Sequence, residues 1–171
     1  DKGYDLLYNT ILSTGSNDAA LTLYQDSSTI LNNNLVARGR NGQCIRLNSD
    51  DTVFQRNQLR MDYNNLYSRD SIIAFTGINF STFQRDTLFT LSDWQQFTGR
   101  DSNSLSVVPG MRNDTDLHAS NGALKAGLPL TQVTDDIDRE PRDPNTPSIG
   151  ADEITDVANL VPQSLRLRTS N

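Results

Sequence analysis

Two consecutive stretches decide the fold: residues 6–29 read LLYNTILSTGSNDAALTLYQDSST, and residues 30–53 read ILNNNLVARGRNGQCIRLNSDDTV. Aligned at an offset of 24, the two stretches share six identical residues, and apolar positions fall on apolar positions. The identical pairs are Leu7 with Leu31, Asn9 with Asn33, Gly15 with Gly39, Asn17 with Asn41, Leu23 with Leu47, and Asp26 with Asp50. A repeat of this length indicates a unit that buries its apolar side chains by stacking on its neighbours.

Short segments of each unit alternate between apolar and polar residues, as half-buried strands do. The apolar side chains expected to point inward are Leu21, Leu23, Ile45 and Leu47. Asn9 and Asn33 fall in the same turn of successive units, where stacked side chains can form hydrogen bonds along the stack. Gly15 and Gly39 fall in aligned turns that need backbone freedom. The sequence therefore predicts an all-β fold, a parallel β-helix.

Two questions about the repeat remain open. A leucine-rich repeat is the rival fold at this period, but neither a Leu-x-x-Leu-x-Leu core nor a helix in each unit is visible, which favours the β-helix. The repeat beyond residue 53 has two candidate continuations, one through Asn57 and Leu59 and the other through residues 63–67 (YNNLY).

From about residue 70 the repeat is lost, and the pattern predicts short strands around residues 72–75, 78–80 and 89, followed by a short helix. Ser92 and Gln95 have the spacing of a capping box, and Gly99 is suited to end a helix. Trp94 and Phe97 would share one face and seal the stacked strands. Stacking of Trp94 on an aromatic ligand is the alternative.

We expect three parts along the chain. Residues 1–98 form the last coils of the β-helix, residues 99–153 form a polar, turn-rich cap, and residues 154–171 form a linker towards a further domain. A cap that prevents pairing at the end of a stack explains the middle part without a ligand. The chain opens on Asp1 without Met, so we read it as a piece of a longer protein.

Composition excludes some classes of function. The net charge is −6, and scattered arginines form no basic stripe, which argues against nucleic-acid binding. No apolar run approaches 18 residues, so no membrane insertion is expected. Cys44 is the single cysteine and His118 the single histidine, far apart in the sequence. We therefore expect Cys44 to be a small buried apolar residue and not a nucleophile.

A series of short motifs follows in a fixed order from about residue 60: residues 62–67 (DYNNLY), 90–95 (TLSDWQ), 98–104 (TGRDSNS), 115–118 (TDLH), 136–142 (DIDREPR) and 147–153 (PSIGADE). This series resembles the C-terminal portion of pectate-lyase-like right-handed β-helix regions in large secreted Bacteroidetes proteins. It departs from that pattern at residues 108–111 (VPGM) and 122–125 (GALK). The resemblance implies a right-handed β-helix with a short helix and a loop-rich C-terminal cap, in an exported, surface-exposed protein that uses a type IX secretion route. It implies no particular substrate.

The expected function is that of a non-catalytic scaffold or adhesive section of a secreted or cell-surface protein, with glycan binding along its side. The alternative is the C-terminal part of a polysaccharide lyase or glycoside hydrolase whose catalytic coils lie upstream. The expected partners are other domains of the same polypeptide, polysaccharide, or secretion and surface machinery.

No catalytic, cofactor-binding or metal-binding residue is assigned from the sequence. An acidic cluster at residues 135–143, with Asp152 and Glu153 beyond it, contains the oxygen ligands that calcium prefers, but ion pairing within a capping loop is the simpler explanation. Lyase chemistry would need calcium-binding acids, of which Asp26 and Asp50 are candidates, and a basic arginine. The candidate arginines, by residue type only, are Arg40, Arg46, Arg56 and Arg60. For His118 a structural hydrogen bond is expected before catalysis.

Overall fold

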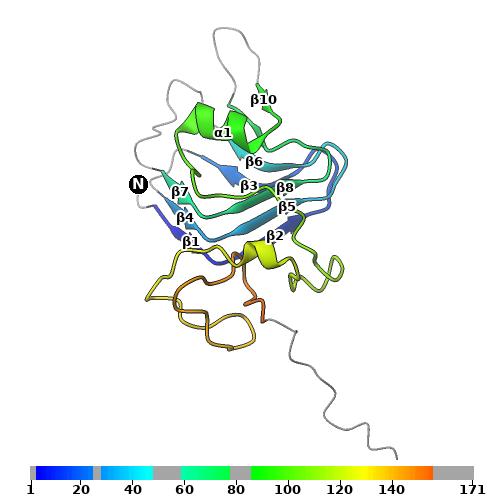
Figure 1. Cartoon of the computed structure of the whole chain (residues 1–171). Coiled ribbons are helices and arrows are strands. Elements are labelled where there is room, and N and C mark those ends of the chain that lie inside the picture. Colours follow the sequence, from blue (N-terminus) through cyan, green and yellow to red (C-terminus); the bar gives the residue numbers. More distant parts are fainter. Residues whose placement is uncertain (1–2, 25–27, 48–58, 78–85, 156–171) are drawn as a thin grey trace, which may run out of the picture.

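The computed structural model describes residues 3–24, 28–47, 59–77 and 86–155. Predictions for Asp26, Asp50, Arg56, Asn57, residues 78–80 and residues 156–171 lie outside these ranges. The described chain is built mostly of strands in parallel sheets, with little helix (Figure 1). This agrees with the all-β class predicted from the sequence.

The strands follow one another along the chain in three triplets. The first triplet comprises β1 (Asp5–Leu7), β2 (Thr10–Ser13) and β3 (Ala19–Leu23), and the second comprises β4 (Thr29–Leu31), β5 (Asn34–Ala37) and β6 (Gln43–Leu47). The third comprises β7 (Arg60–Asp62), β8 (Asn65–Ser68) and β9 (Ala74–Phe75), after which come β10 (Thr87–Leu88), the helix α1 (Leu91–Thr98) and the 3₁₀ turn η1 (Gly122–Leu124).

Corresponding strands of successive triplets pair side by side in three sheets, β1–β4–β7, β2–β5–β8 and β3–β6–β9–β10. All pairs are parallel except β9 with β10. Leu7 pairs with Leu31 and Leu23 pairs with Leu47, which confirms the predicted offset of 24. Asn34 pairs with Asn65, so residues 63–67 continue the repeat at an offset of 31, because the connection from β6 to β7 is longer than that from β3 to β4.

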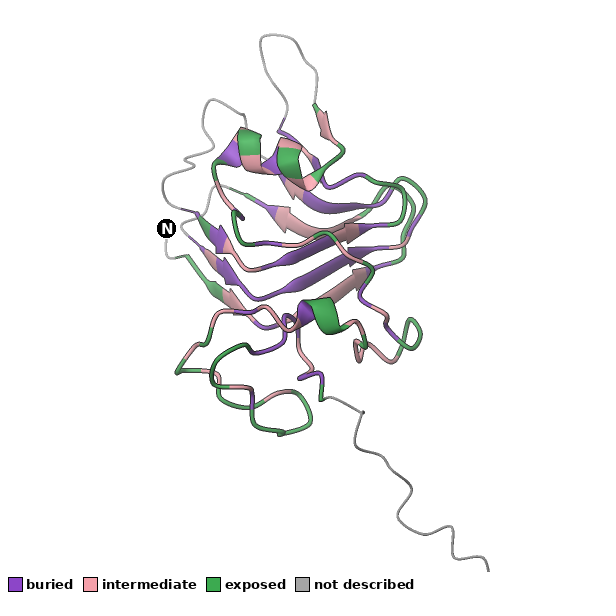
Figure 2. Ribbon diagram, in the orientation of Figure 1, coloured by how far each residue is buried: buried purple, intermediate pink, exposed green. Residues whose placement is uncertain are grey.

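Apolar side chains from all three sheets pack in one core cluster. Figure 2 shows that buried residues concentrate in the strands. The predicted inward positions Leu23, Ile45 and Leu47 are buried, and Leu21 packs against them. Cys44 is also buried, and burial raises the pKa of its thiol. A buried thiol of raised pKa is a poor nucleophile, so the prediction of a structural cysteine is confirmed.

The stacked asparagines form the ladder that the sequence predicts. The Asn9 N–H donates to Oδ1 of Asn33 at 2.9 Å, and the Asn33 N–H donates to Oδ1 of Asn64 at 2.9 Å. Each side chain therefore satisfies a backbone donor of the neighbouring unit at a turn where no strand partner exists. The Asn64 N–H in turn donates to Oγ of Ser104 at 2.8 Å, which carries the ladder into the segment that follows α1.

Gly39 lies where two turns approach each other too closely for a side chain. A Cβ atom at this position would lie 1.8 Å from the carbonyl oxygen of Gly15, so any other residue would force the stacked turns apart. Asn17 and Asn41, in the same pair of turns, have positive φ values of 56° and 51°. Asparagine tolerates this left-handed conformation better than most residues, which explains its recurrence at the corner.

The helix α1 begins two residues earlier than predicted. Its N-cap is Thr90, whose hydroxyl accepts from the Asp93 N–H at 3.0 Å, while the Asp93 carboxylate accepts from the Thr90 N–H at 2.9 Å. The predicted box of Ser92 with Gln95 is therefore wrong, because the carboxylate of Asp93 fills the third helical position after Thr90. The predicted end at Gly99 is confirmed, since this residue has a left-handed φ of 68°.

The chain after α1 first pairs with β8, and its later loops then cover β1 and β2. Leu105 forms a parallel bridge to Asn65 beside β8. The later loops, yellow to orange in Figure 1, lie along β1 and β2. They are fastened at Asn32, whose Oδ1 accepts from the Leu128 N–H at 2.8 Å and whose carbonyl accepts from the Gly150 N–H at 2.8 Å.

Arg142 anchors the same loops by a different set of contacts. Its guanidinium lies 4.0 Å from the centre of the Tyr8 ring, a cation–π distance, and it pairs with Glu153 at 3.6 Å. Its Nη2 donates to the carbonyls of Gly150 and Ala151. A buried charge with this many partners holds the cap to the strands, as the predicted internal ion pairing requires.

Candidate functional site

The first candidate site is a groove beside β7, with a volume of about 400 Å³. Its polar and aromatic lining comes from Arg60, Asp62, Tyr63, Arg100, Asp101 and Ser102, and its apolar lining comes from Leu31, Leu59, Met61 and Leu128. The groove thus combines an aromatic ring with charges of both signs. It lies where the end of β7 meets residues 99–102 and Leu128.

Tyr63 occupies a strained position in this groove. Its φ is 55°, and it follows β7 at the turn where Asn32 follows β4 with a φ of 59°. A left-handed conformation costs a side chain such as tyrosine about 1–2 kcal/mol. Tyr8 has the same φ of 55° after β1, so the strain belongs to this corner in each unit, and it is the place in the groove that distinguishes Tyr63.

The charged residues of the groove differ in how firmly they are held. Asp62 accepts from the backbone N–H and from Nδ2 of Asn103, both at 2.8 Å. Arg100 donates from Nε to the Leu59 carbonyl at 2.8 Å. Arg60 is exposed at the start of β7. The groove therefore offers a fixed carboxylate, a fixed guanidinium and an adjustable one.

The arginines proposed from residue type do not converge. Arg60 lines the groove, whereas Arg46 donates from its guanidinium to the Asn17 carbonyl in a different turn. Asp26, Asp50 and Arg56 lie outside the described ranges. Within the described chain, the structure does not bring these residue types into one catalytic arrangement.

The second candidate site surrounds His118 in the cap. The imidazole Nδ1 contacts Asp116, and Nε2 lies 2.7 Å from Oδ2 of Asp138. Hydrogen bonds with these two carboxylates raise the pKa of His118 to about 9. The structural hydrogen bonding expected for His118 is therefore confirmed, with Asp116 and Asp138 as partners.

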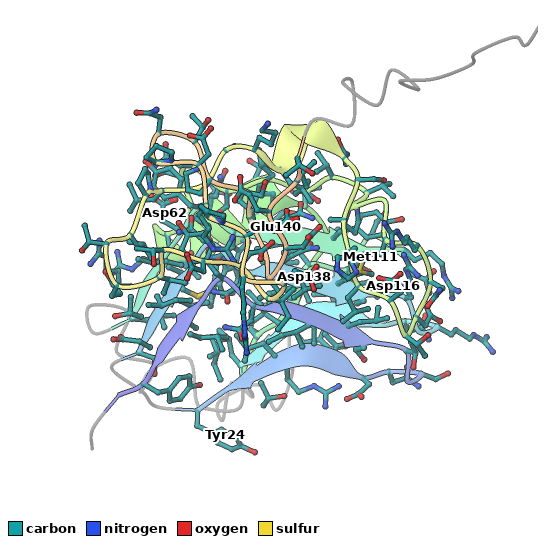
Figure 3. The ribbon with its side chains drawn as sticks, turned by 90° about the horizontal axis from the view of Figure 1, so that it is seen from below. Tyr24, Asp62, Met111, Asp116, Asp138 and Glu140 are labelled. Carbon is teal, nitrogen blue, oxygen red and sulfur yellow. The ribbon has the colours of Figure 1, made fainter. Side chains whose placement is uncertain are left out.

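Asp152 completes the group around His118. Burial raises the pKa of Asp152, while the nearby His118 lowers it and Asp136 and Asp138 raise it further. In Figure 3 Asp62 and Asp116 lie on opposite sides of the view, so the groove beside β7 and the His118 cluster are separate sites.

The acidic cluster at residues 135–143 is divided among several tasks. Asp136 accepts from the backbone N–H groups of Asp138 and Glu140 at 2.8 Å and of Glu153 at 2.9 Å. Asp143 accepts from two backbone N–H groups that follow it. Asp136 and Asp143 therefore stabilise backbone turns of the cap, whereas Asp138 contacts His118.

Trp94 does not form the aromatic binding surface considered from the sequence. Its side chain is fully buried, and Nε1 donates to Oδ2 of Asp101 at 2.7 Å. Phe97 packs beside it against the core, as expected for one apolar helix face. The indole is therefore a structural element, and that alternative is wrong.

Sequence reasoning assigned neither site, although it singled out some of their residues. Tyr63 was part of an echo of the repeat, and only its place in the groove distinguishes it. Asp116, His118, Asp138 and Asp152 lie on loops without periodicity, so no spacing rule could bring them together. The available signals were the acidic cluster at residues 135–143 and the single histidine, which ends the motif at residues 115–118.

Comparison with family models, curated proteins and solved structures gave no match to this chain. Over the described residues, no helix has the length and apolar character needed to cross a membrane.

The ion pairs of His118 predict a pH dependence of stability. Because the pKa is raised to about 9 in the folded protein, the stabilisation is complete below the unfolded value of about 6.5 and is lost as the pH rises through 9. We expect a loss of no more than about 1 kcal/mol, since the pair is partly exposed and screened. Urea unfolding of untagged protein between pH 6 and 10, with chelator, measures it.

The control for this effect is the variant His118→Gln, which retains a neutral hydrogen-bonding side chain. Its free energy of unfolding should change less than that of the wild type between pH 6 and 10. Equal slopes in the two proteins would show that His118 does not contribute to the pH dependence.

Proposed function

We propose that this chain is a section of a right-handed parallel β-helix, of the pectate-lyase-like kind, in a large secreted or cell-surface protein. In this proposal it acts as a non-catalytic scaffold with an adhesive surface that binds polysaccharide in the groove beside β7. Its partners are other domains of the same polypeptide, the polysaccharide, and the secretion or surface machinery.

The repeated parallel pairing supports the scaffold part of the proposal. Three successive triplets pair strand by strand, and the ladder of Asn9, Asn33 and Asn64 fixes their register. A unit that contacts only its neighbours extends the molecule in one direction. An extended, rigid body presents a lateral surface at a distance from its attachment, which suits a surface protein.

The aromatic ring of Tyr63 in an open groove is the observation that supports the adhesive part. Sugar rings present faces of C–H groups that pack on aromatic rings, and their hydroxyls form hydrogen bonds with fixed charged groups. Tyr63, Asp62 and Arg100 provide these elements around about 400 Å³ of space. The two arginines favour a glycan that carries carboxylates, since a guanidinium binds a carboxylate in a bidentate manner.

Binding of acidic polysaccharide should weaken about tenfold in the variant Tyr63→Asn, which removes the ring and keeps a residue suited to positive φ. Arg60→Ala should weaken it by a similar factor. Affinity electrophoresis against plant, algal and host polysaccharides measures both effects. The matched controls are Tyr24→Ala and Arg69→Ala, exposed residues outside the groove lining, which should change the affinity less than twofold.

The same samples are assayed for released product. Retention that is lost in Tyr63→Asn supports the adhesive surface, whereas retention that is unchanged in this variant places binding elsewhere and contradicts it. Unsaturated products or new reducing ends would favour the lyase or hydrolase alternative. Absence of retention for every polysaccharide would remove the adhesive part and leave the scaffold.

A further inference from the structure

Three side chains from separate loops of the cap converge on one point. His118, Asp138 and Asp152 each offer one ligand atom, and these atoms all lie within 4.8 Å of one another. The residues are 20 and 34 positions apart along the chain, so the convergence arises from the fold and not from one acidic run. One member is an imidazole, which distinguishes the group from an ordinary cluster of surface carboxylates.

A contact of Asp116 with Nδ1 fixes the orientation of the His118 imidazole. Asp116 contacts Nδ1 of His118, and this leaves Nε2 directed at Asp138, whose Oδ2 lies 2.7 Å away. Histidine ligands of metals typically donate their other ring N–H to a carboxylate, which fixes the tautomer and the ring plane. Asp116 occupies the place of that supporting carboxylate.

The group is accessible from solvent. A cavity of about 480 Å³ opens beside it and is lined by Arg112, His118, Ser120, Asp138, Glu140, Asp152 and Glu153. The side chain of Asp138 is more than half exposed, so it has room to adjust. A fourth ligand, either water or Glu140 from the same cavity, has space beside the three converging atoms.

We propose that His118, Asp138 and Asp152 bind one divalent transition-metal cation of the zinc type, with Asp116 as the positioning residue for the imidazole. Tetrahedral zinc has bonds of about 2.0–2.1 Å to nitrogen and oxygen ligands, which places the ligand atoms roughly 3.3 Å apart. The observed atoms need only small movements to reach that geometry. The imidazole selects against calcium, which prefers oxygen ligands throughout.

Such a cation would fasten two parts of the cap that are distant in sequence, the loop at residues 116–118 and the segment at residues 138–152. This proposal does not rest on polysaccharide binding, because the groove beside β7 is a separate site. We expect bound cation to stabilise the folded protein, because a cation that binds only the folded state shifts the folding equilibrium by mass action.

The test uses untagged protein that has been treated with a chelator and exchanged into metal-free buffer. Calorimetric titration with Zn²⁺ should show one site per chain, and the same titration with Ca²⁺ should show binding at least a hundredfold weaker. Addition of Zn²⁺ should raise the melting temperature. Because His118 is the only histidine, the imidazole NMR signals report its coordination without assignment of other residues.

Variants identify the ligands. His118→Gln and Asp152→Asn should each weaken Zn²⁺ binding at least tenfold, and Asp116→Asn should weaken it about tenfold through the orientation of the ring. Asp114→Asn is the matched control, since it removes an exposed carboxylate of the same cap that pairs with Arg38, and it should change the affinity less than twofold.

Absence of one-site Zn²⁺ binding would overturn the proposal, as would binding that leaves the imidazole signals unshifted or is unchanged in His118→Gln. Equal affinity for Ca²⁺ and Zn²⁺ would overturn the choice of metal. If a variant fails to fold, the imidazole signals of the wild-type protein still decide between coordination and its absence.

Discussion

Replacing Asn33 by alanine is expected to lower the free energy of unfolding by about 4 kcal/mol, because the change leaves several buried polar groups without partners. The Asn33 side chain is fully buried between the first and third units. Its Oδ1 accepts from the Asn9 backbone N–H, and its Nδ2 donates to the carbonyls of Leu6 at 2.8 Å and of Leu31 at 3.0 Å. Alanine can replace none of these bonds.

The Asn9 N–H lies at a corner between strands, whereas the Leu31 carbonyl also accepts from the Tyr8 N–H at 3.1 Å. The Asn33 amide also bonds to the side chains of Asn9 and Asn64. An unsatisfied buried polar group costs about 1–3 kcal/mol, and the loss of this set of bonds accounts for the expected effect. Asn33→Asp keeps the acceptor and loses the donors, and it also places a charge in a buried position. We therefore expect this nearly isosteric variant to be destabilised as strongly as the alanine variant.

Urea unfolding followed by circular dichroism measures both changes. Asn145→Ala is the matched control, because Asn145 is exposed in the cap and only its backbone N–H forms a hydrogen bond, to Asp143. The control should lose less than about 0.5 kcal/mol. A similar small loss in Asn33→Ala would mean that the ladder does not fix the register of the units.

The same asparagine shows why part of the fold could be predicted. Asn9 and Asn33 recur at an offset of 24 because stacked units need the same side chain at the same corner, and such a constraint is visible in one sequence. Asn64, the corresponding residue of the third unit, lies 31 residues after Asn33. Because this offset differs from 24, the sequence did not show that Asn64 belongs to the ladder. Strand pairing tolerates extra residues in the turns, so periodicity identifies a repeat only while the turns keep their length.

The residues of the candidate sites do not recur at a fixed period, so the sequence predicted little of these sites. His118 and Asp138 meet because two irregular loops are fastened to the strands at Asn32 and by Arg142. These contacts follow no period along the sequence, so no repeat rule could predict them. The acidic cluster was visible, but its division between backbone capping by Asp136 and contact with His118 by Asp138 depends on loop geometry.

Replacing Asp101 by alanine should also cost about 4 kcal/mol, since its carboxyl group joins α1, the asparagine ladder and the following loop. It accepts from Nε1 of Trp94 at 2.7 Å, from Nδ2 of Asn64 at 2.9 Å and from Oγ of Ser104 at 2.6 Å. All four side chains are buried. Alanine would leave the indole N–H without an acceptor inside the core and would detach the helix from the ladder.

The loss of stability in Asp101→Ala should depend on pH. Burial raises its pKa, against the lowering effect of the bonds from Ser104, Trp94 and Asn64. A carboxyl whose folded pKa is raised contributes most stability below its unfolded value of about 3.9 and loses it as the pH rises towards the folded value. The difference between wild type and Asp101→Ala should therefore be larger at pH 5 than at pH 8.

Urea unfolding at the two pH values tests both parts of this prediction, and the fluorescence of Trp94, the only tryptophan, reports the environment of the helix directly. Asp135→Ala serves as the control, because Asp135 is exposed and its loss should cost less than about 0.5 kcal/mol. A small loss in Asp101→Ala with unchanged fluorescence would show that apolar packing alone holds α1. A loss that grows towards pH 8 would instead show that the ionised carboxylate is the form the fold stabilises, since the three donors would then outweigh the cost of burial.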